Sequence, residues 1–121
     1  MDVPADLLTR LRDHLAETGY TIDGVRERLG DVAATALARE ELVPAIRATR
    51  DLDPLGTLIR LWWLGLAVPE GRTGLPVAEL AAAGLLERDG DEVRATVHLQ
   101  PWETGGYLVS DRKVRPGDPA L

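Results

Sequence analysis

The sequence predicts a mainly helical α+β domain, with helices in the first half and a β-hairpin at the end of the second. Two periodicities support this prediction. Apolar residues recur at three- and four-residue steps as far as Gly65, and apolar and polar residues alternate between Val93 and Leu99. The length of 121 residues is that of one domain, so we expect residues 1–121 to fold as a single cooperative unit.

Residues 1–50 predict a helical extension. Its first helix, over 4–18, begins with a proline, carries leucines at helical spacing and ends before a glycine. A short second helix is expected to stop at Gly30, and Asp31 can cap a third helix. Pro44 interrupts or restarts that third helix, because proline lacks the backbone donor that a helix interior needs.

The clearest helix start lies at Asp53, an N-cap acid followed by Pro54 at the first helical position, and we expect this helix to end at Gly65. Trp62 and Trp63 are neighbours within it and project about 100° apart on a helix with 3.6 residues per turn. We expect both indoles in the core. The alternative is that one of them faces a partner domain or a second copy.

The second half changes from helical to strand patterning. In order, we expect a loop at 69–76, a short helix at 77–83, a strand at 85–87, a turn at 89–91, a strand at 93–99 and a returning strand at 107–109. Helix, short helix and hairpin in this order are typical of a winged helix-turn-helix, which we place at 53–111. Residues 112–121 show no periodicity and predict a tail or linker.

The charges disfavour nucleic acid as a partner, although winged helices often bind DNA. The net charge is −6 and the pI about 4.8, so phosphates are repelled at long range. The expected recognition helix, 76–83, contains Glu79 and no cation, and its adjoining loop offers only Arg72. The basic residues gather elsewhere, at Arg39, Arg47, Arg50 and Arg60 and at Arg112, Lys113 and Arg115. Arg47 and Arg50 could pair with nearby acids such as Asp51 and Asp53.

The residue inventory predicts no catalytic, metal or cofactor-binding site. Cysteine is absent and the two histidines lack metal-ligand spacing. Ser110, the one serine, is not in a nucleophile elbow, His98 is expected on the outward face of a strand, and no glycine-rich phosphate loop occurs. The longest apolar stretch, 61–69, is too short to span a membrane and no signal peptide is evident, which predicts a cytoplasmic protein.

The aromatic residues are the best candidates for a binding surface. We expect a partner or ligand surface formed by Trp62, Trp63, Trp102 and Tyr107, since aromatic side chains dominate interface energies.

Several segments together resemble a known family across nearly the whole chain. They are 19–25 (GYTIDGV), 36–40 (ALARE), 44–50 (PAIRATR), 53–55 (DPL), 64–65 (LG), 83–86 (AGLL), 90–95 (GDEVRA) and 109–111 (VSD). In this order they resemble the N-terminal region of actinobacterial class I S-adenosylmethionine-dependent methyltransferases, which look related to the glutamine methyltransferases of release factors. The resemblance implies a structural region that precedes a Rossmann-like catalytic domain.

That catalytic domain carries an Asp-x-Gly-x-Gly cofactor loop and an Asn-Pro-Pro-Tyr motif, and neither motif occurs in this chain. No catalytic residue and no cofactor can therefore be carried over. The resemblance implies an accessory domain that presents substrate to, or packs against, a methyltransferase domain in the same or another chain. The alternatives from the residues alone are a standalone winged-helix module that binds a protein or small ligand and, less favoured by charge, a transcription regulator. A homo-oligomer is a further alternative for the partner.

Overall fold

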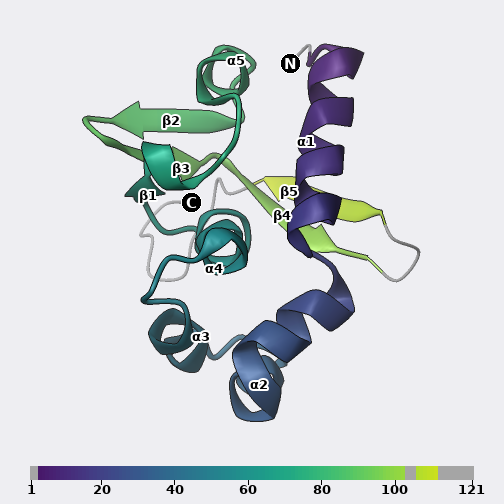
Figure 1. Cartoon of the computed structure of the whole chain (residues 1–121), viewed down its shortest axis with the longest axis vertical. Helices are drawn as coiled ribbons and strands as arrows, with labels where there is room; N and C mark the ends of the chain where they lie inside the picture. The colour runs from purple at the N-terminus through teal and green to yellow at the C-terminus, as the bar shows by residue number, and fades with distance from the viewer. Residues whose placement is uncertain (1–2, 103–105, 112–121) are drawn as a thin grey trace, which may run out of the picture.

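The computed structural model describes residues 3–102 and 106–111. Over these residues the chain is mixed α+β with two small antiparallel sheets. Its elements are α1 (Ala5–Thr18), α2 (Ile22–Ala38), α3 (Val43–Ala48), α4 (Pro54–Leu58), a π-helical turn η1 (Ile59–Trp63), β1 (Val68–Pro69), a 3₁₀ turn η2 (Glu70–Arg72), α5 (Val77–Ala82), β2 (Leu86–Asp89), β3 (Glu92–Ala95), β4 (Val97–Pro101) and β5 (Tyr107–Asp111) (Figure 1).

The helix boundaries predicted in the first half are largely confirmed. α1 ends where Gly19 adopts a left-handed conformation with φ 93°. The two helices predicted on either side of Gly30 are both present within α2, where a kink separates them at Gly30, whose angles of φ 83° and ψ 164° are non-helical. A positive φ is readily accessible to glycine, so the first helix ends there and the second begins in a new direction.

The helix predicted from Asp53 begins as expected. Asp53 accepts a hydrogen bond from the backbone N–H of Gly56 at 2.8 Å, which caps α4. The helix then widens into η1, where the Leu64 N–H donates to the Ile59 carbonyl five residues earlier at 3.0 Å. π-helical turns are rare and are often associated with functional sites.

The strand predicted at 93–99 is wrong as a single element. It breaks at Thr96, so that β3 pairs with β2 and β1 in a sheet of order β1-β3-β2, while β4 pairs with β5. The cause is non-local, because Thr96 donates through its backbone to the Leu85 carbonyl at 3.0 Å and through its hydroxyl to the Gly84 carbonyl at 2.6 Å. The returning strand is confirmed as β5, but β1 lies where only a loop was predicted.

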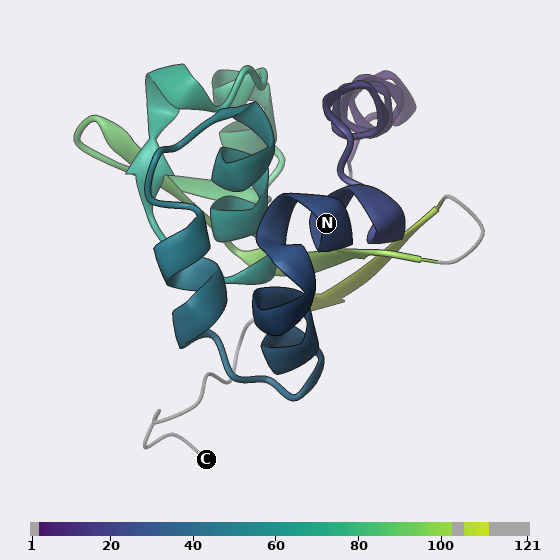
Figure 2. The same cartoon turned by 60° about the horizontal axis from the view of Figure 1, so that its bottom comes forward.

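One apolar core joins the N-terminal helices to the rest of the chain. Leu7, Leu11 and Leu15 of α1 share a buried cluster with Trp62 of η1 and with residues of α5 and both sheets. The β4–β5 hairpin projects away from the three-stranded sheet (Figures 1 and 2). None of the described helices combines the length and apolarity needed to cross a membrane.

Candidate partner-binding groove

An apolar groove runs along α2, between that helix and β4. One part of it has a volume of about 360 Å³ and is lined by Ile22, Val25, Arg26, Ala34, Leu37, Ala38, Trp63, Gln100, Pro101 and Trp102. A second hollow of about 590 Å³ shares Leu37, Ala38, Trp63 and Gln100 with it and adds Glu40, Leu42 and His98. Because the two share four residues, they form one continuous depression with Trp63 at its centre.

The groove is apolar along its floor and charged at its two ends. Arg26 lies near the start of α2, and Glu40 lies just beyond its last turn. Both side chains are exposed, and within the described part of the chain neither makes an ion pair. The groove therefore offers one positive and one negative group to a ligand that lies along it.

The indole of Trp63 is positioned by β4. Its ring contacts the His98 imidazole edge-on, with centroids 6.3 Å apart and planes at 89°. His98 Nε2 in turn lies 3.1 Å from Gln100 Oε1, two residues further along the strand. These contacts hold Trp63 against the strand that forms the opposite wall of the groove. His98, predicted as an outward surface residue, is partly buried there.

The four residues that were predicted to form one surface do not all lie together. Trp62 is fully buried at 0% exposure, whereas Trp63 is partly buried in the groove and Trp102 is 50% exposed at its edge. Tyr107 lies elsewhere, with its ring stacked on Tyr20 at 6.0 Å and its hydroxyl donating to the Tyr20 carbonyl at 3.0 Å. Burial raises the pKa of Tyr107. The structure thus brings together Trp63 and Trp102, and it does not join Trp62 or Tyr107 to them.

Sequence reasoning missed the α2 wall of the groove. Val25 and Leu37 follow the helical apolar period, which predicts only that they face inward. Both are buried, yet both also line the groove.

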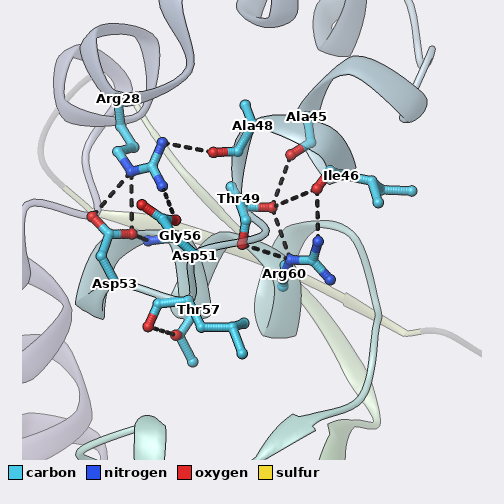
Figure 3. Close-up of polar contacts among 11 residues, drawn as sticks. Arg28, Ala45, Ile46, Ala48, Thr49, Asp51, Asp53, Gly56, Thr57 and Arg60 are labelled. Atoms are coloured by element: carbon cyan, nitrogen blue, oxygen red, sulfur yellow. Dashed lines mark hydrogen bonds and ion pairs between the residues drawn. The ribbon is translucent and has the colours of Figure 1, made fainter.

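A polar network centred on Arg28 of α2 fixes the segment between α3 and α4 (Figure 3). Arg28 Nε donates to both carboxylate oxygens of Asp53, at 3.1 and 3.0 Å, Nη1 donates to the Ala48 carbonyl at 2.9 Å and Nη2 to Asp51 at 2.6 Å. Arg28 rather than Arg47 or Arg50 therefore pairs with these acids, which corrects the pairing expected from sequence proximity.

The network shifts the pKa values of Arg28 and Asp53. Hydrogen bonding to Asp53 raises the pKa of Arg28. Burial opposes ionisation of Asp53, but the hydrogen bonds from Arg28 and the Gly56 N–H outweigh it and lower the Asp53 pKa below its ordinary 3.8. Arg60 completes the network by donating to the Thr49 carbonyl at 2.9 Å and to the Ile46 carbonyl at 2.7 Å. These contacts join α2, α3 and α4, so they support the structure of this segment.

The helix that was predicted to be a recognition helix, α5, contacts α1. Arg10 donates to Glu79 through both terminal nitrogens, at 3.1 Å for Nη1. That hydrogen bond lowers the pKa of Glu79 and raises that of Arg10. His14 of α1 also lies 3.1 Å from the Thr73 carbonyl in the segment that precedes α5. Helix α1 therefore contacts both α5 and the segment before it.

The described residues contain no group of three or more His, Asp or Glu side chains arranged to hold a metal ion. The predicted tail at 112–121, with Arg112, Lys113 and Arg115, lies outside the described residues. The groove beside Trp63 is consequently the best candidate site in the described part of the chain.

Comparison with known protein families yields one match. Residues 17–96, about two thirds of the chain, match the family model described as a domain of unknown function, DUF7059. The chain belongs to this family. The DUF7059 match runs from the last turn of α1 to the break at Thr96, so it includes Trp63 and the α2 wall and excludes Trp102 and the β4–β5 hairpin. No curated protein and no solved structure matches the chain.

Proposed function

We propose that this DUF7059 domain is a non-catalytic recognition module that binds a protein segment in the groove between α2 and β4. The observation that carries this proposal is the convergence of Trp63 and Trp102 on one apolar depression. Aromatic anchors in desolvated pockets supply most of the energy of protein interfaces. A segment with an apolar anchor for the groove floor, an acidic residue near Arg26 and a basic residue near Glu40 complements its charges.

The resemblance of the sequence to methyltransferase N-terminal regions supports a more specific role. In this proposal the domain acts with an S-adenosylmethionine-dependent methyltransferase domain, by binding that domain or the protein that it methylates. The genomic reading frame offers a direct check. A frame that continues past Leu121 into an Asp-x-Gly-x-Gly loop supports an intramolecular role, and a frame without it favours a standalone binding module.

A winged helix is the second part of the proposal, assigned to the unit from α4 to β3. The strand order β1-β3-β2, with α5 directly before the β2–β3 hairpin, supports this assignment. The Arg10–Glu79 contact and the negative net charge disfavour DNA as the ligand of such a unit. In this arrangement α1 takes the place beside α5 that DNA takes in regulators.

Selection from a random peptide library displayed on phage tests the groove. The full chain is the bait, and selected peptides are measured by calorimetry against Trp102→Ala and a matched variant, Val32→Ala. Val32 is 82% exposed on α2 and lies outside the groove. We expect Trp102→Ala to weaken binding at least about tenfold, the scale of one lost interface anchor, and Val32→Ala to leave it unchanged. Equal binding by both variants would contradict the proposed site.

A further inference from the structure

The hollow at the Glu40 end of the groove combines apolar walls with a carboxylate. It has a volume of about 590 Å³, and Leu37, Leu42 and Trp63 supply its apolar lining. Among the described residues that line it, Glu40 is the one acid, and neither lysine nor arginine occurs. A cation that enters the hollow would therefore meet an opposite charge and no lysine or arginine that repels it.

The polar side chains of the opposite wall contact each other. On β4, His98 Nε2 lies 3.1 Å from Gln100 Oε1, and the His98 ring contacts the Trp63 indole edge-on. Glu40 is exposed, and its carboxylate makes no ion pair within residues 3–102 and 106–111. The carboxylate is therefore available to a ligand.

The backbone at Glu40 is unusual for a glutamate. Glu40 follows α2 with a left-handed φ of 63°. Its N–H donates to the Leu37 carbonyl and the Glu41 N–H donates to the Ala36 carbonyl, both at 2.9 Å, which together form a Schellman motif. Glycine usually occupies this position, and the partial negative charge of a helix C-terminus repels a carboxylate. Glutamate here opposes stability on two counts, and backbone strain of this kind is concentrated at functional sites.

We propose that this hollow binds an arginine side chain of the protein segment that occupies the groove. The proposal rests on the groove function above and specifies the basic residue that the segment presents. The aliphatic part of the arginine packs on Leu37, Leu42 and Trp63, and its guanidinium pairs with Glu40. The C-terminal end of α2 adds its partial negative charge to that of the carboxylate, so the charge that is unfavourable in the free domain attracts the cation.

Arginine fits this hollow better than lysine does. Its guanidinium is planar and weakly hydrated, stacks on aromatic rings and can donate two parallel hydrogen bonds to one carboxylate. The ammonium group of lysine is a strongly hydrated point charge, so placing it beside an apolar lining costs more. A neutral aliphatic side chain such as norleucine would fill the apolar part and leave Glu40 without a partner. The affinity should therefore fall from arginine to lysine to norleucine.

An NMR titration of the full chain tests this assignment. The probes are the Nα-acetyl methylamides of arginine, lysine and norleucine, and binding is followed through the Trp63 indole N–H and the methyl groups of Leu37 and Leu42. The arginine probe should shift these signals saturably and bind about fivefold more tightly than the norleucine probe, the upper scale of a solvent-exposed ion pair. Equal binding of the lysine or norleucine probe, or the absence of shifts at these residues, would overturn the proposal.

Variants of Glu40 separate binding from stability. Glu40→Gln and Glu40→Gly should both lower the affinity for the arginine probe to that for norleucine. Glu40→Gly should also raise the thermal midpoint, because glycine adopts the left-handed backbone readily and the repulsion from the helix end is removed. Unfolding would then not explain its loss of binding. A lowered midpoint in Glu40→Gly, or wild-type affinity in either variant, would contradict the proposal.

Glu41→Gln is the matched control. It makes the same change in net charge at the next residue, which does not line the groove, and should bind the arginine probe as the wild type does. An equal loss in Glu41→Gln would show a general charge effect and overturn the assignment. The peptide selection on the groove distinguishes the two proposals. Peptides that depend on Trp102, together with an arginine probe that does not bind, would refute the arginine site and leave the groove function standing.

Discussion

Truncation of the two adjacent tryptophans should produce unequal losses of stability. Trp62 is fully buried within the main core cluster, so Trp62→Ala leaves a closed cavity and should cost about 3–5 kcal/mol of unfolding free energy. Trp63 borders the groove, where water can fill the vacated space. Trp63→Ala should therefore cost less, about 2 kcal/mol, because it loses burial without creating a closed void.

Guanidinium denaturation followed by circular dichroism measures both losses. A small domain has a total stability of roughly 5–15 kcal/mol, so Trp62→Ala should shift the midpoint strongly while the slope stays unchanged. The second readout is binding. Trp63→Ala should abolish binding of groove-selected peptides although it remains folded. Equal losses of stability in the two variants would refute the reasoning, since both indoles would then be core residues and the groove would not open at Trp63.

Four further predictions follow from the charges and backbone geometry. Calorimetry should detect no saturable binding of S-adenosylmethionine at micromolar concentration, because the sequence lacks the glycine-rich turn that holds this cofactor. Saturable binding would contradict this prediction. Random duplex DNA should show no gel shift at near-physiological salt, and a salt-sensitive shift that Arg72→Ala abolishes would restore the regulator hypothesis. Arg28→Ala should lower the free energy of unfolding by about 2 kcal/mol at neutral pH. Because the fold lowers the pKa of Asp53, the stability that the Arg28–Asp53 pair adds should be lost as the pH falls below 3.8, which acid unfolding of the wild type and of Arg28→Ala can measure. Gly24→Ala should lower the thermal midpoint far more than Gly71→Ala, because a Cβ at Gly24 would lie 2.0 Å from the Gly19 carbonyl oxygen and one at Gly71 meets no atom within 4 Å.

The sequence was sufficient where local interactions decide the structure. Asp53 followed by Pro54 predicts the start of α4, and the structure confirms both the helix and its cap. Gly30 predicts a helix boundary, and the structure confirms it, because two helices within α2 meet at a kink there. In each case the deciding hydrogen bond or dihedral angle lies within a few residues, so a linear pattern contains it.

The sequence was insufficient where distant partners decide the structure. Alternation from Val93 to Leu99 predicts one strand, but the bonds from Thr96 to Gly84 and Leu85 divide it between two sheets. β1 pairs with β3 through two residues, one of them a proline, and so short a strand leaves no periodic pattern. The groove could not be predicted for the same reason. Its walls come from α2, η1 and β4, and whether their aromatic residues meet depends on packing that no single segment encodes.

The placement of α1 bears on which surface of the domain can bind a partner. In a DNA-binding winged helix, the recognition helix must present donors to phosphates and bases. Here α5 presents Glu79, and that carboxylate is already engaged by Arg10 of α1, which lowers its pKa and keeps it anionic. The surface of α5 is thus acidic and partly covered. Exposed apolar side chains lie on the β4–β5 side at Trp102 and Leu108, and the partly buried Trp63 lines the groove beside α2. Because Leu108 is opposite Gln100 in the hairpin, it lies on the same face of the sheet as the groove wall. A partner in the groove would therefore lie beside the exposed Leu108 of the hairpin.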